Sequence, residues 1–319
     1  MKEIGGYLQL DTYNLPMIHE NAIALNCGRN ALAYILEAKK IKKIWLPIFL
    51  CDSVSHVCKK YQTGVKCYHI NKSFEPVDVQ PQESDWIYIV NYYGQLTEER
   101  ITILSQKYKN IIVDNAHNYY AKPIKNIDTL YTCRKFWGVS DGAFLYTDTI
   151  LEREIPQDIS FERMHFVLGR YEKSASDFYI EASQNNDFFG NEPIKKMSKL
   201  TWNLLHAIDY EKARMRRTQN FKYLFDFFGN VNALKLRIPD GAFMYPLMIP
   251  NAYILRRKLI EKCIYIPVLW PEILQKCPKE LLEYKFASDI LPIPCDQRYS
   301  LCDMKYLSHI IKSILFEGD

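Results

Sequence analysis

The chain has 319 residues, of which 48% are hydrophobic and 24% charged, and this length and balance favour a globular protein of two domains. The net charge of +4 is spread without a long basic block, and no apolar run is long enough to span a membrane, so we expect neither nucleic-acid binding nor membrane insertion. The N-terminus also lacks the apolar core of a signal peptide, which leads us to expect a cytoplasmic protein.

The first predicted elements are an irregular arm and a helix that begins at a glycine. Residues 1–20 hold only scattered apolar anchors, and Gly28 then precedes a helix with Ala31, Leu32 and Ile35 on one face. A glycine at a helix start lets backbone N–H groups approach an anion, so a phosphate site is one interpretation. An ordinary helix start is the more common interpretation of the same spacing.

Strands and helices alternate over the next hundred or so residues. We predict strands at residues 43–46, 65–70, 86–93, 111–113, 130–132 and 143–147, and helices at residues 54–61 and 97–108. Gly64 ends the first of these helices, and Thr97 can cap the second. Strands that alternate with short helices predict an α/β fold with a mostly parallel sheet and right-handed crossovers.

The pattern changes after about residue 151 and returns near residue 243. We predict a helical, aromatic-rich stretch at residues 160–186 and helices at residues 198–208, 210–228, 253–263 and 304–315, with strands at residues 243–249, 264–269 and 290–295. The long helix at residues 210–228 is the natural bridge between two domains. We therefore predict a large domain at residues 1–209 and a smaller C-terminal α/β domain at residues 210–319.

The bridging helix is basic. Arg214, Arg216 and Arg217 could meet nucleotide phosphates, but a solvated helix face is the more typical interpretation of such a run.

The cysteines and histidines do not suggest a cross-linked or metal-binding protein. The nine cysteines contain no Cys-x-x-Cys pair, and a disulfide framework is improbable in a chain of this length with a normal core. Cys67, Cys133 and Cys263 lie inside apolar runs, where a small buried side chain is expected. The seven histidines show no zinc-ligand spacing, so no metal site is predicted.

An acid and an amine follow neighbouring predicted strands. Asp114 ends the strand at residues 111–113, His117 comes three residues later, and Lys135 follows the strand at residues 130–132. Ligands of open α/β sheets bind at this edge of the sheet. A carboxylate for a pyridinium nitrogen and a lysine for a Schiff base are what a protein provides for pyridoxal phosphate (PLP). The ordinary alternatives are a loop-capping acid, a hydrogen-bonded loop histidine and a surface lysine.

The order of these features resembles the fold type I PLP enzymes, and within them the DegT/DnrJ/EryC1/StrS sugar aminotransferases, over nearly the whole chain. The segments that carry the resemblance are Asn26-Cys27-Gly28-Arg29-Asn30-Ala31-Leu32, Asn91-Tyr92-Tyr93-Gly94, Asp114-Asn115-Ala116-His117, Thr132-Cys133-Arg134-Lys135, Ile264-Tyr265-Ile266-Pro267 and Leu291-Pro292-Ile293-Pro294. The resemblance implies an α/β fold of type I, with a large domain around a mostly parallel sheet and a smaller C-terminal domain.

The resemblance also implies roles for single residues. Lys135 would form the Schiff base and move the α-proton of the substrate, and Asp114 would pair with the protonated pyridine nitrogen. His117 would hydrogen-bond the 3′ oxygen of the cofactor or lie against its ring. The cofactor phosphate would bind the N–H groups of Gly28 and Arg29, with further cofactor contacts from the hydroxyl of Thr132 and from the position of Cys51.

The sequence departs from the family pattern at two of these positions. Arg29 stands where the family has a threonine, and an arginine can bind phosphate or point away from it. The aromatic residue that covers the cofactor ring falls near Cys51, with Phe49 close by, and the sequence does not decide between them. The chain is also shorter than typical relatives, so its substrate pocket would be reduced or shared more heavily with a partner subunit.

The implied activity is transfer of an amino group from an amino acid such as glutamate to a nucleotide-linked keto sugar, in polysaccharide or antigen biosynthesis. Family members are homodimers with shared active sites, and the crossing loop would be the stretch from Tyr179 to Asn191, whose alternative is a packed helix end. Another PLP reaction on a similar sugar, as in the dehydratase branch, is less favoured because that branch has histidine in place of Lys135. A non-catalytic accessory or scaffold subunit is a further alternative. A nicotinamide dehydrogenase is not favoured, since the chain has no Gly-x-Gly-x-x-Gly turn.

Overall fold

The computed structural model describes residues 4–316. Residues 1–3 of the predicted large domain and residues 317–319 of the predicted small domain lie outside the described part. Residues 4–22 form neither helix nor strand, which agrees with the predicted irregular arm over the part that is described. None of the helices within residues 4–316 has the length and apolar character needed to cross a membrane.

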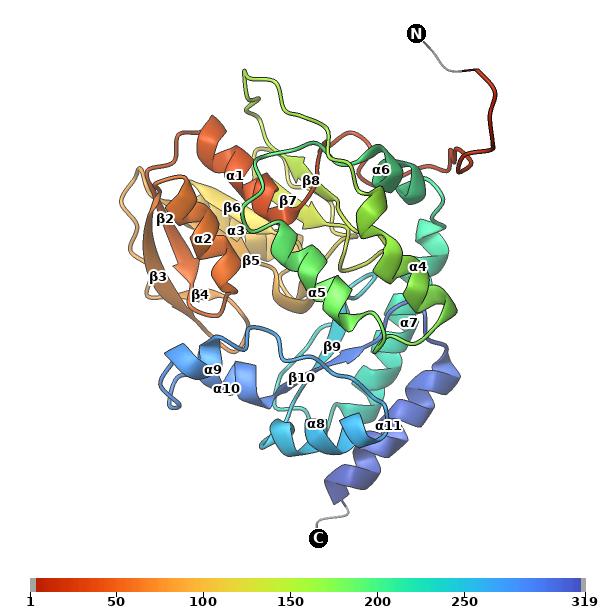
Figure 1. Cartoon of the computed structure of the whole chain (residues 1–319). Coiled ribbons are helices and arrows are strands. Elements are labelled where there is room, and N and C mark those ends of the chain that lie inside the picture. The colour runs from red at the N-terminus through yellow and green to blue at the C-terminus, as the bar shows by residue number, and fades with distance from the viewer. Residues whose placement is uncertain (1–3, 317–319) are drawn as a thin grey trace.

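An eight-stranded sheet lies in the first half of the chain (Figure 1). Its strands are β1 (Ile23–Leu25), β2 (Lys43–Pro47), β3 (Gly64–Ile70), β4 (Pro76–Val77), β5 (Trp86–Val90), β6 (Ile111–Asp114), β7 (Asp128–Thr132) and β8 (Ala143–Tyr146). They lie in the order β1-β8-β7-β6-β5-β2-β3-β4, and the strands from β7 to β3 in this order run parallel. The β1, β8 and β4 strands run antiparallel to their neighbours, so the mostly parallel sheet is confirmed.

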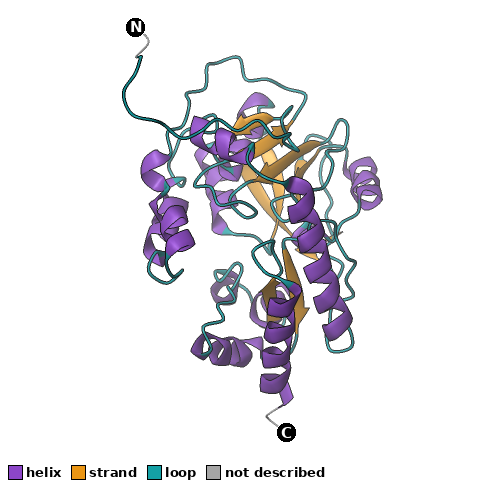
Figure 2. Cartoon of the chain, turned by 90° about the vertical axis from the view of Figure 1, so that its right-hand side faces the viewer, coloured by secondary structure: helices purple, strands orange, loops and turns teal. Residues whose placement is uncertain are grey.

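Helices lie on both sides of this sheet (Figure 2). In the first half they are α1 (Gly28–Ala38), α2 (Asp52–Lys60) and α3 (Glu98–Tyr108), with a 3-10 turn, η1 (Tyr92–Gly94). The α3 helix begins as predicted, because the Thr97 side chain accepts a hydrogen bond from the Arg100 N–H at 3.1 Å. The α1 helix packs on β7 and β8, which places its first turn near the end of β7.

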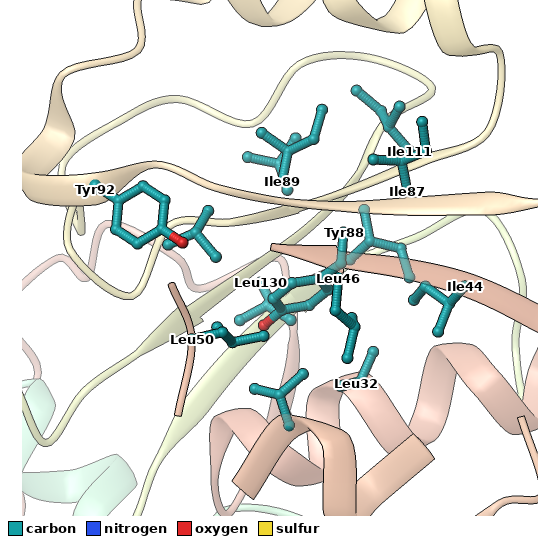
Figure 3. Close-up of a cluster of buried hydrophobic side chains, with 14 of the residues drawn as sticks. Leu32, Ile44, Leu46, Leu50, Ile87, Tyr88, Ile89, Tyr92, Ile111 and Leu130 are labelled. Carbon is teal, nitrogen blue, oxygen red and sulfur yellow. The ribbon is translucent and has the colours of Figure 1, made fainter. Parts of the chain in front are cut away.

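An aliphatic core fixes the strands relative to one another. Successive side chains of β5 point to opposite faces, with Ile87 and Ile89 on one side and Tyr88 on the other, beside Leu46 of β2 and Leu32 of α1 (Figure 3). All five are almost completely buried. Burial of both faces explains why the strand is continuously apolar, and close packing makes the strand ends a rigid platform for a site.

The second half of the chain is mostly helical around a small sheet. Its elements are a 3-10 turn, η2 (Phe161–Arg163), then α4 (His165–Glu172), α5 (Tyr179–Phe188), α6 (Lys199–Leu205), α7 (Tyr210–Phe228), β9 (Met244–Met248), α8 (Ala252–Glu261), α9 (Ile273–Lys276), α10 (Leu282–Asp289), β10 (Ile290–Pro294) and α11 (Leu301–Phe316). The β9 and β10 strands form an antiparallel pair. The α7 helix runs from the large sheet toward this pair (Figure 1). A separate cluster of buried residues, including Phe221, Leu247 and Ile311, packs there, and the domain boundary at residues 209 and 210 stays a prediction.

Three predicted elements differ from the structure. The strand predicted to reach Tyr93 ends at Val90, because Tyr93 and Gly94 take positive φ angles of 52° and 68° that break an extended strand. Residues 264–269 form no strand; Pro267 offers no N–H for a ladder, and β9 pairs with β10 instead. The helical stretch at residues 160–186 is split into α4 and α5.

The prediction for the cysteines was wrong at two of three positions. Cys133 is buried, but Cys67 and Cys263 are exposed. Cys67 lies on β3, which has only the short β4 beyond it and exposes most of its residues. An apolar run therefore did not indicate burial near the sheet edge.

Candidate active site

The strand ends bring Asp114 and Lys135 to the same edge of the large sheet. The β6 and β7 strands are parallel neighbours, with Asp114 opposite Leu130. After β7 the chain makes a tight turn, in which the N–H groups of Phe136 and Trp137 each donate to the Cys133 carbonyl at 2.9 Å. This turn holds Lys135 close enough to Asp114 for the two charges to interact.

The carboxylate of Asp114 is buried and held by two hydrogen bonds. The Tyr88 hydroxyl donates to Oδ2 at 2.8 Å, and the Ala116 N–H donates to Oδ1 at 2.8 Å. Burial raises the pKa of the Asp114 carboxyl, while the positive charge of Lys135 and these two hydrogen bonds oppose that shift. Strand β5, which carries Tyr88, and the loop after β6, which carries Ala116, therefore fix the direction of the Asp114 carboxylate.

The Lys135 side chain is exposed to solvent, yet its surroundings disfavour the charged form of its amine. Its side chain is exposed, between two neighbours in sequence of which Phe136 is buried and Arg134 is half-buried. The surrounding protein still displaces enough water to lower the pKa of the Lys135 amine, and the nearby Asp114 opposes this shift. A lysine with a lowered pKa is neutral for a larger fraction of the time, which makes it a better nucleophile.

His117 lies beside the amine as a neutral ring. Burial lowers its pKa far below the ordinary value, and the charge of Lys135 lowers it further. Its Nδ1 accepts a hydrogen bond from the Tyr93 N–H at 3.4 Å. The proton of the neutral imidazole is therefore on Nε2, where it can be donated to a ligand.

Of the two candidates for covering a cofactor ring, Cys51 is the one near Lys135. Cys51 precedes α2 and lies in the neighbourhood of the Lys135 amine; its Sγ lies 2.7 Å from the Ser53 Oγ. Phe49 is 1% exposed and packs with Tyr92 in a buried aromatic cluster. Which of the two would cover a cofactor ring stays a prediction.

The start of α1 lies at the same sheet edge. A Cβ on Gly28 would be 3.9 Å from Leu130 Cδ1 on β7, and the preceding Cys27 gives the helix no side-chain cap. Thr132 ends β7 and is buried. Arg29 instead turns to α5, where it donates to the Asn186 carbonyl at 2.9 Å and to the Asn186 Oδ1 at 2.8 Å. An uncapped helix start presents free N–H groups and the positive end of the helix dipole to an anion.

Three comparisons with known proteins were informative only at the level of structure. No family model and no curated protein sequence matches the chain. Solved structures do match: a DegT DnrJ EryC1 StrS aminotransferase from Brucella abortus has a TM-score of 0.62 and 14% identity, covering 92% of this chain and 85% of that one. The sugar aminotransferase CalS13 from Micromonospora echinospora gives 0.60 and 14%, over 92% and 87%. NtdA from Bacillus subtilis, with bound cofactor PMP, gives 0.64 and 15%, over 91% and 73%.

The chain shares the fold of these solved structures. The expected α/β architecture of fold type I is confirmed over most of the chain. At these identities the likeness concerns the fold, so the chemistry has to be argued from the side chains at the sheet edge.

Two residues at this edge of the sheet were missed in the sequence. Phe243 stacks on His117 with ring centroids 4.4 Å apart, and its ring centroid is 5.6 Å from the Lys135 Nζ. Trp270 stacks on His117 at 5.5 Å. Both lie more than a hundred residues from His117 along the chain, and no local pattern marks them. The start of β9 and the loop after α8 therefore complete the site.

The residues at this edge fit PLP in kind. Lys135 supplies an accessible amine, Asp114 a buried carboxylate fixed by hydrogen bonds, and the start of α1 a place for an anion. Lys135, Asp114, His117 and the first turn of α1 would hold the cofactor, with Cys51 and Phe243 nearby. Those three features serve three different parts of one molecule: its aldehyde, its ring nitrogen and its phosphate.

Proposed function

We propose that the protein is a PLP-dependent aminotransferase that moves an amino group from an amino acid such as glutamate to a nucleotide-linked keto sugar, in polysaccharide or antigen biosynthesis. The observation that carries the proposal is the close approach of Lys135 and Asp114 at the sheet edge, beside the uncapped start of α1. Solved structures with this fold include a sugar aminotransferase and a protein with bound PMP, which supports the same chemistry here.

Bound PLP supplies an electron-withdrawing ring that stabilises negative charge at the α-carbon of the amino acid. Asp114 would hold a proton on the ring nitrogen, because its carboxylate is fixed by Tyr88 and by the Ala116 N–H.

Lys135 would carry the proton between substrate atoms. Its lowered pKa would let the amine act as a base toward the α-carbon of the amino acid and then return the proton as an acid. His117, neutral and protonated on Nε2, would orient the cofactor ring or its 3′ oxygen, since the Tyr93 N–H fixes the Nδ1 of the imidazole.

The proposal is tested by covalent labelling. Borohydride reduction of the protein with PLP should attach the cofactor to Lys135, and Lys135→Ala should abolish both the label and transamination. Lys72→Ala, at an exposed lysine of the loop before β4, is the matched control and should keep both. A Lys135→Ala protein that transaminates normally would refute the assignment.

A catalytically altered protein is the second candidate, either with other PLP sugar chemistry or as an accessory or scaffold subunit. The observation in its favour is Arg29, which donates to Asn186 of α5 and does not point freely toward a phosphate. Failure of the purified protein to bind PLP would favour the scaffold.

We also propose that the protein is a homodimer with shared active sites, and that it works in the cytoplasm. The exposed Tyr179 and Ile180 at the start of α5 support a contact with a second copy there. Sedimentation of the wild type and of Tyr179→Ser tests the dimer, which the substitution should weaken.

A further inference from the structure

Arg134, the residue before Lys135, carries a guanidinium group with too few acceptors. Its Nε is fully buried and has no hydrogen-bond partner among the described residues. Its one hydrogen bond within residues 4–316 joins Nη2 to the Asn186 Oδ1 at a long 3.4 Å. The Phe189 ring lies 4.7 Å from the guanidinium carbon and orients the group, but an aromatic face satisfies none of its N–H donors.

The positive charge of Arg134 has other positive charges nearby and no carboxylate paired with it among the described residues. Arg29 and Arg163 lie close enough to repel it, and burial and these charges lower its pKa. Arg163 has its own carboxylate partner, Asp158, at 2.8 Å. The nearby Asp141 accepts hydrogen bonds from Ser198 and Thr201 at α6 and makes no ion pair with Arg134. A half-buried cation with an unpaired, buried Nε is stabilised when an anion joins it.

Arg134 also lies next to the start of α1. Its charge acts on the Cys27 thiol, the residue before the first turn of that helix. The helix has 11 residues and no side-chain cap, and the Cys27 thiol is only a weak acceptor for the Arg29 and Asn30 N–H groups, so these groups can bind an anion. Arg29, in this first turn, donates to the same Asn186 Oδ1 as Arg134, which places the Arg134 guanidinium near the helix start.

We propose that Arg134 is a charged ligand for a phosphate group, which it binds together with the first turn of α1. An arginine fork can donate two parallel hydrogen bonds to a phosphate. The inference rests on the proposed function in assigning this phosphate to PLP. The phosphate of a nucleotide-linked substrate has the same chemistry, and the experiment separates the two.

The experiment measures the dissociation constants of PLP, of pyridoxal, which lacks the phosphate, and of UDP, by quenching of tryptophan fluorescence. Arg134→Gln should weaken PLP binding by about tenfold to a hundredfold, the usual effect of losing a hydrogen bond between charged groups. Pyridoxal binding should not change, and Arg134→Lys should recover part of the loss. Arg153→Gln, which removes an exposed arginine paired with Glu37 near the other end of α1, is the matched control and should change neither constant.

Each other outcome is decisive. If UDP binding weakens and PLP binding does not, the phosphate belongs to the substrate. If the wild type binds PLP and Arg134→Gln leaves both PLP and UDP binding unchanged, the inference is wrong while the proposed function stands. An equal loss of PLP and pyridoxal binding also overturns it, since the arginine would then act on the ring or on Lys135. If the wild type binds no PLP, the proposed function fails, and the UDP series alone decides whether Arg134 binds phosphate.

Discussion

Two arginines lie at the turn that carries Lys135, Arg134 within it and Arg217 bonded to it, and their surroundings differ. Arg217 of α7 is 1% exposed; it donates to the Ala242 carbonyl at 2.9 Å and to the Phe136 carbonyl at 3.0 Å. Arg134 has one long bond, to a side-chain amide. The Nε atoms of both arginines are buried without a partner among the described residues, so the contrast lies in the other guanidinium nitrogens. The comparison teaches that buried charge alone does not mark a ligand site, because the terminal nitrogens of Arg217 already have carbonyl acceptors.

The hydrogen bonds of Arg217 have a structural consequence for the site. Phe136 follows Lys135 directly, and Ala242 precedes Phe243, which stacks on His117. Arg217 thus ties the turn that holds the amine to the segment that leads into β9. Its guanidinium also lies 4.5 Å from the centre of the Phe136 ring.

The largest expected effect is on stability, from Arg217→Met. The substitution removes the Arg217 hydrogen bonds to the Ala242 and Phe136 carbonyls and leaves Gln297 as the side-chain donor to the Phe136 carbonyl, so it should lower the free energy of unfolding by about 3 kcal/mol. Arg134→Gln, in the protein without ligands, should cost much less, because it removes few hydrogen bonds and relieves repulsion from Arg29. Urea unfolding of both variants measures this. If Arg134→Gln proves as destabilising as Arg217→Met, the two arginines do not differ in the way we describe.

The spacing of apolar residues along α7 indicated that Arg217 is buried, although the arginines around it favoured an exposed face. Arg217, Phe221, Leu224 and Phe228 are spaced by four, three and four residues, which puts the arginine on the buried stripe of α7. Its neighbours Arg214 and Arg216 made a solvated face the natural prediction, which was wrong for Arg217. Periodicity is a better guide to burial than the charge of a side chain.

The site was predictable as far as local pattern reaches. Asp114 and Lys135 follow buried strands, and parallel neighbours bring such positions together whatever the rest of the chain does. Phe243 and Trp270 come from distant segments, and their place depends on how the C-terminal part packs on the sheet. Arg134 was visible in the sequence, but only the lack of acceptors around it distinguishes it, and that is a property of the folded chain.

A smaller effect, with a definite pH dependence, is expected from Asp114→Asn in the protein without ligands. Burial raises the pKa of Asp114 in the folded state above its unfolded value, so ionisation of the carboxyl destabilises the fold. Below the unfolded pKa of about 4 both states are protonated and the variant gains nothing. As the pH rises through the raised folded pKa, the wild type loses stability and Asp114→Asn does not.

Urea unfolding at a series of pH values from 4 to 8 measures the difference. The asparagine can keep both hydrogen bonds, accepting from the Ala116 N–H and donating to the Tyr88 hydroxyl. Glu83→Gln, at a fully exposed acid, is the control and should show no such trend. If the difference in free energy of unfolding between Asp114→Asn and wild type became smaller with rising pH, this result would contradict the raised pKa of Asp114.

The smallest effect is expected from Arg214→Gln, one turn before Arg217 on the same helix. Arg214 pairs with Glu211 and with Asp240, at 2.5 and 2.6 Å, but both acids are well exposed. Exposed ion pairs contribute at most about 1 kcal/mol, because water and salt screen the charges and the long side chains lose freedom. Thermal unfolding should therefore show little change in Tm, and in 1 M NaCl none. If the loss of stability instead matched that of Arg217→Met and persisted in high salt, exposed carboxylates would stabilise an arginine as much as buried carbonyls do. The difference between Arg217 and Arg134 would then not follow from their acceptors.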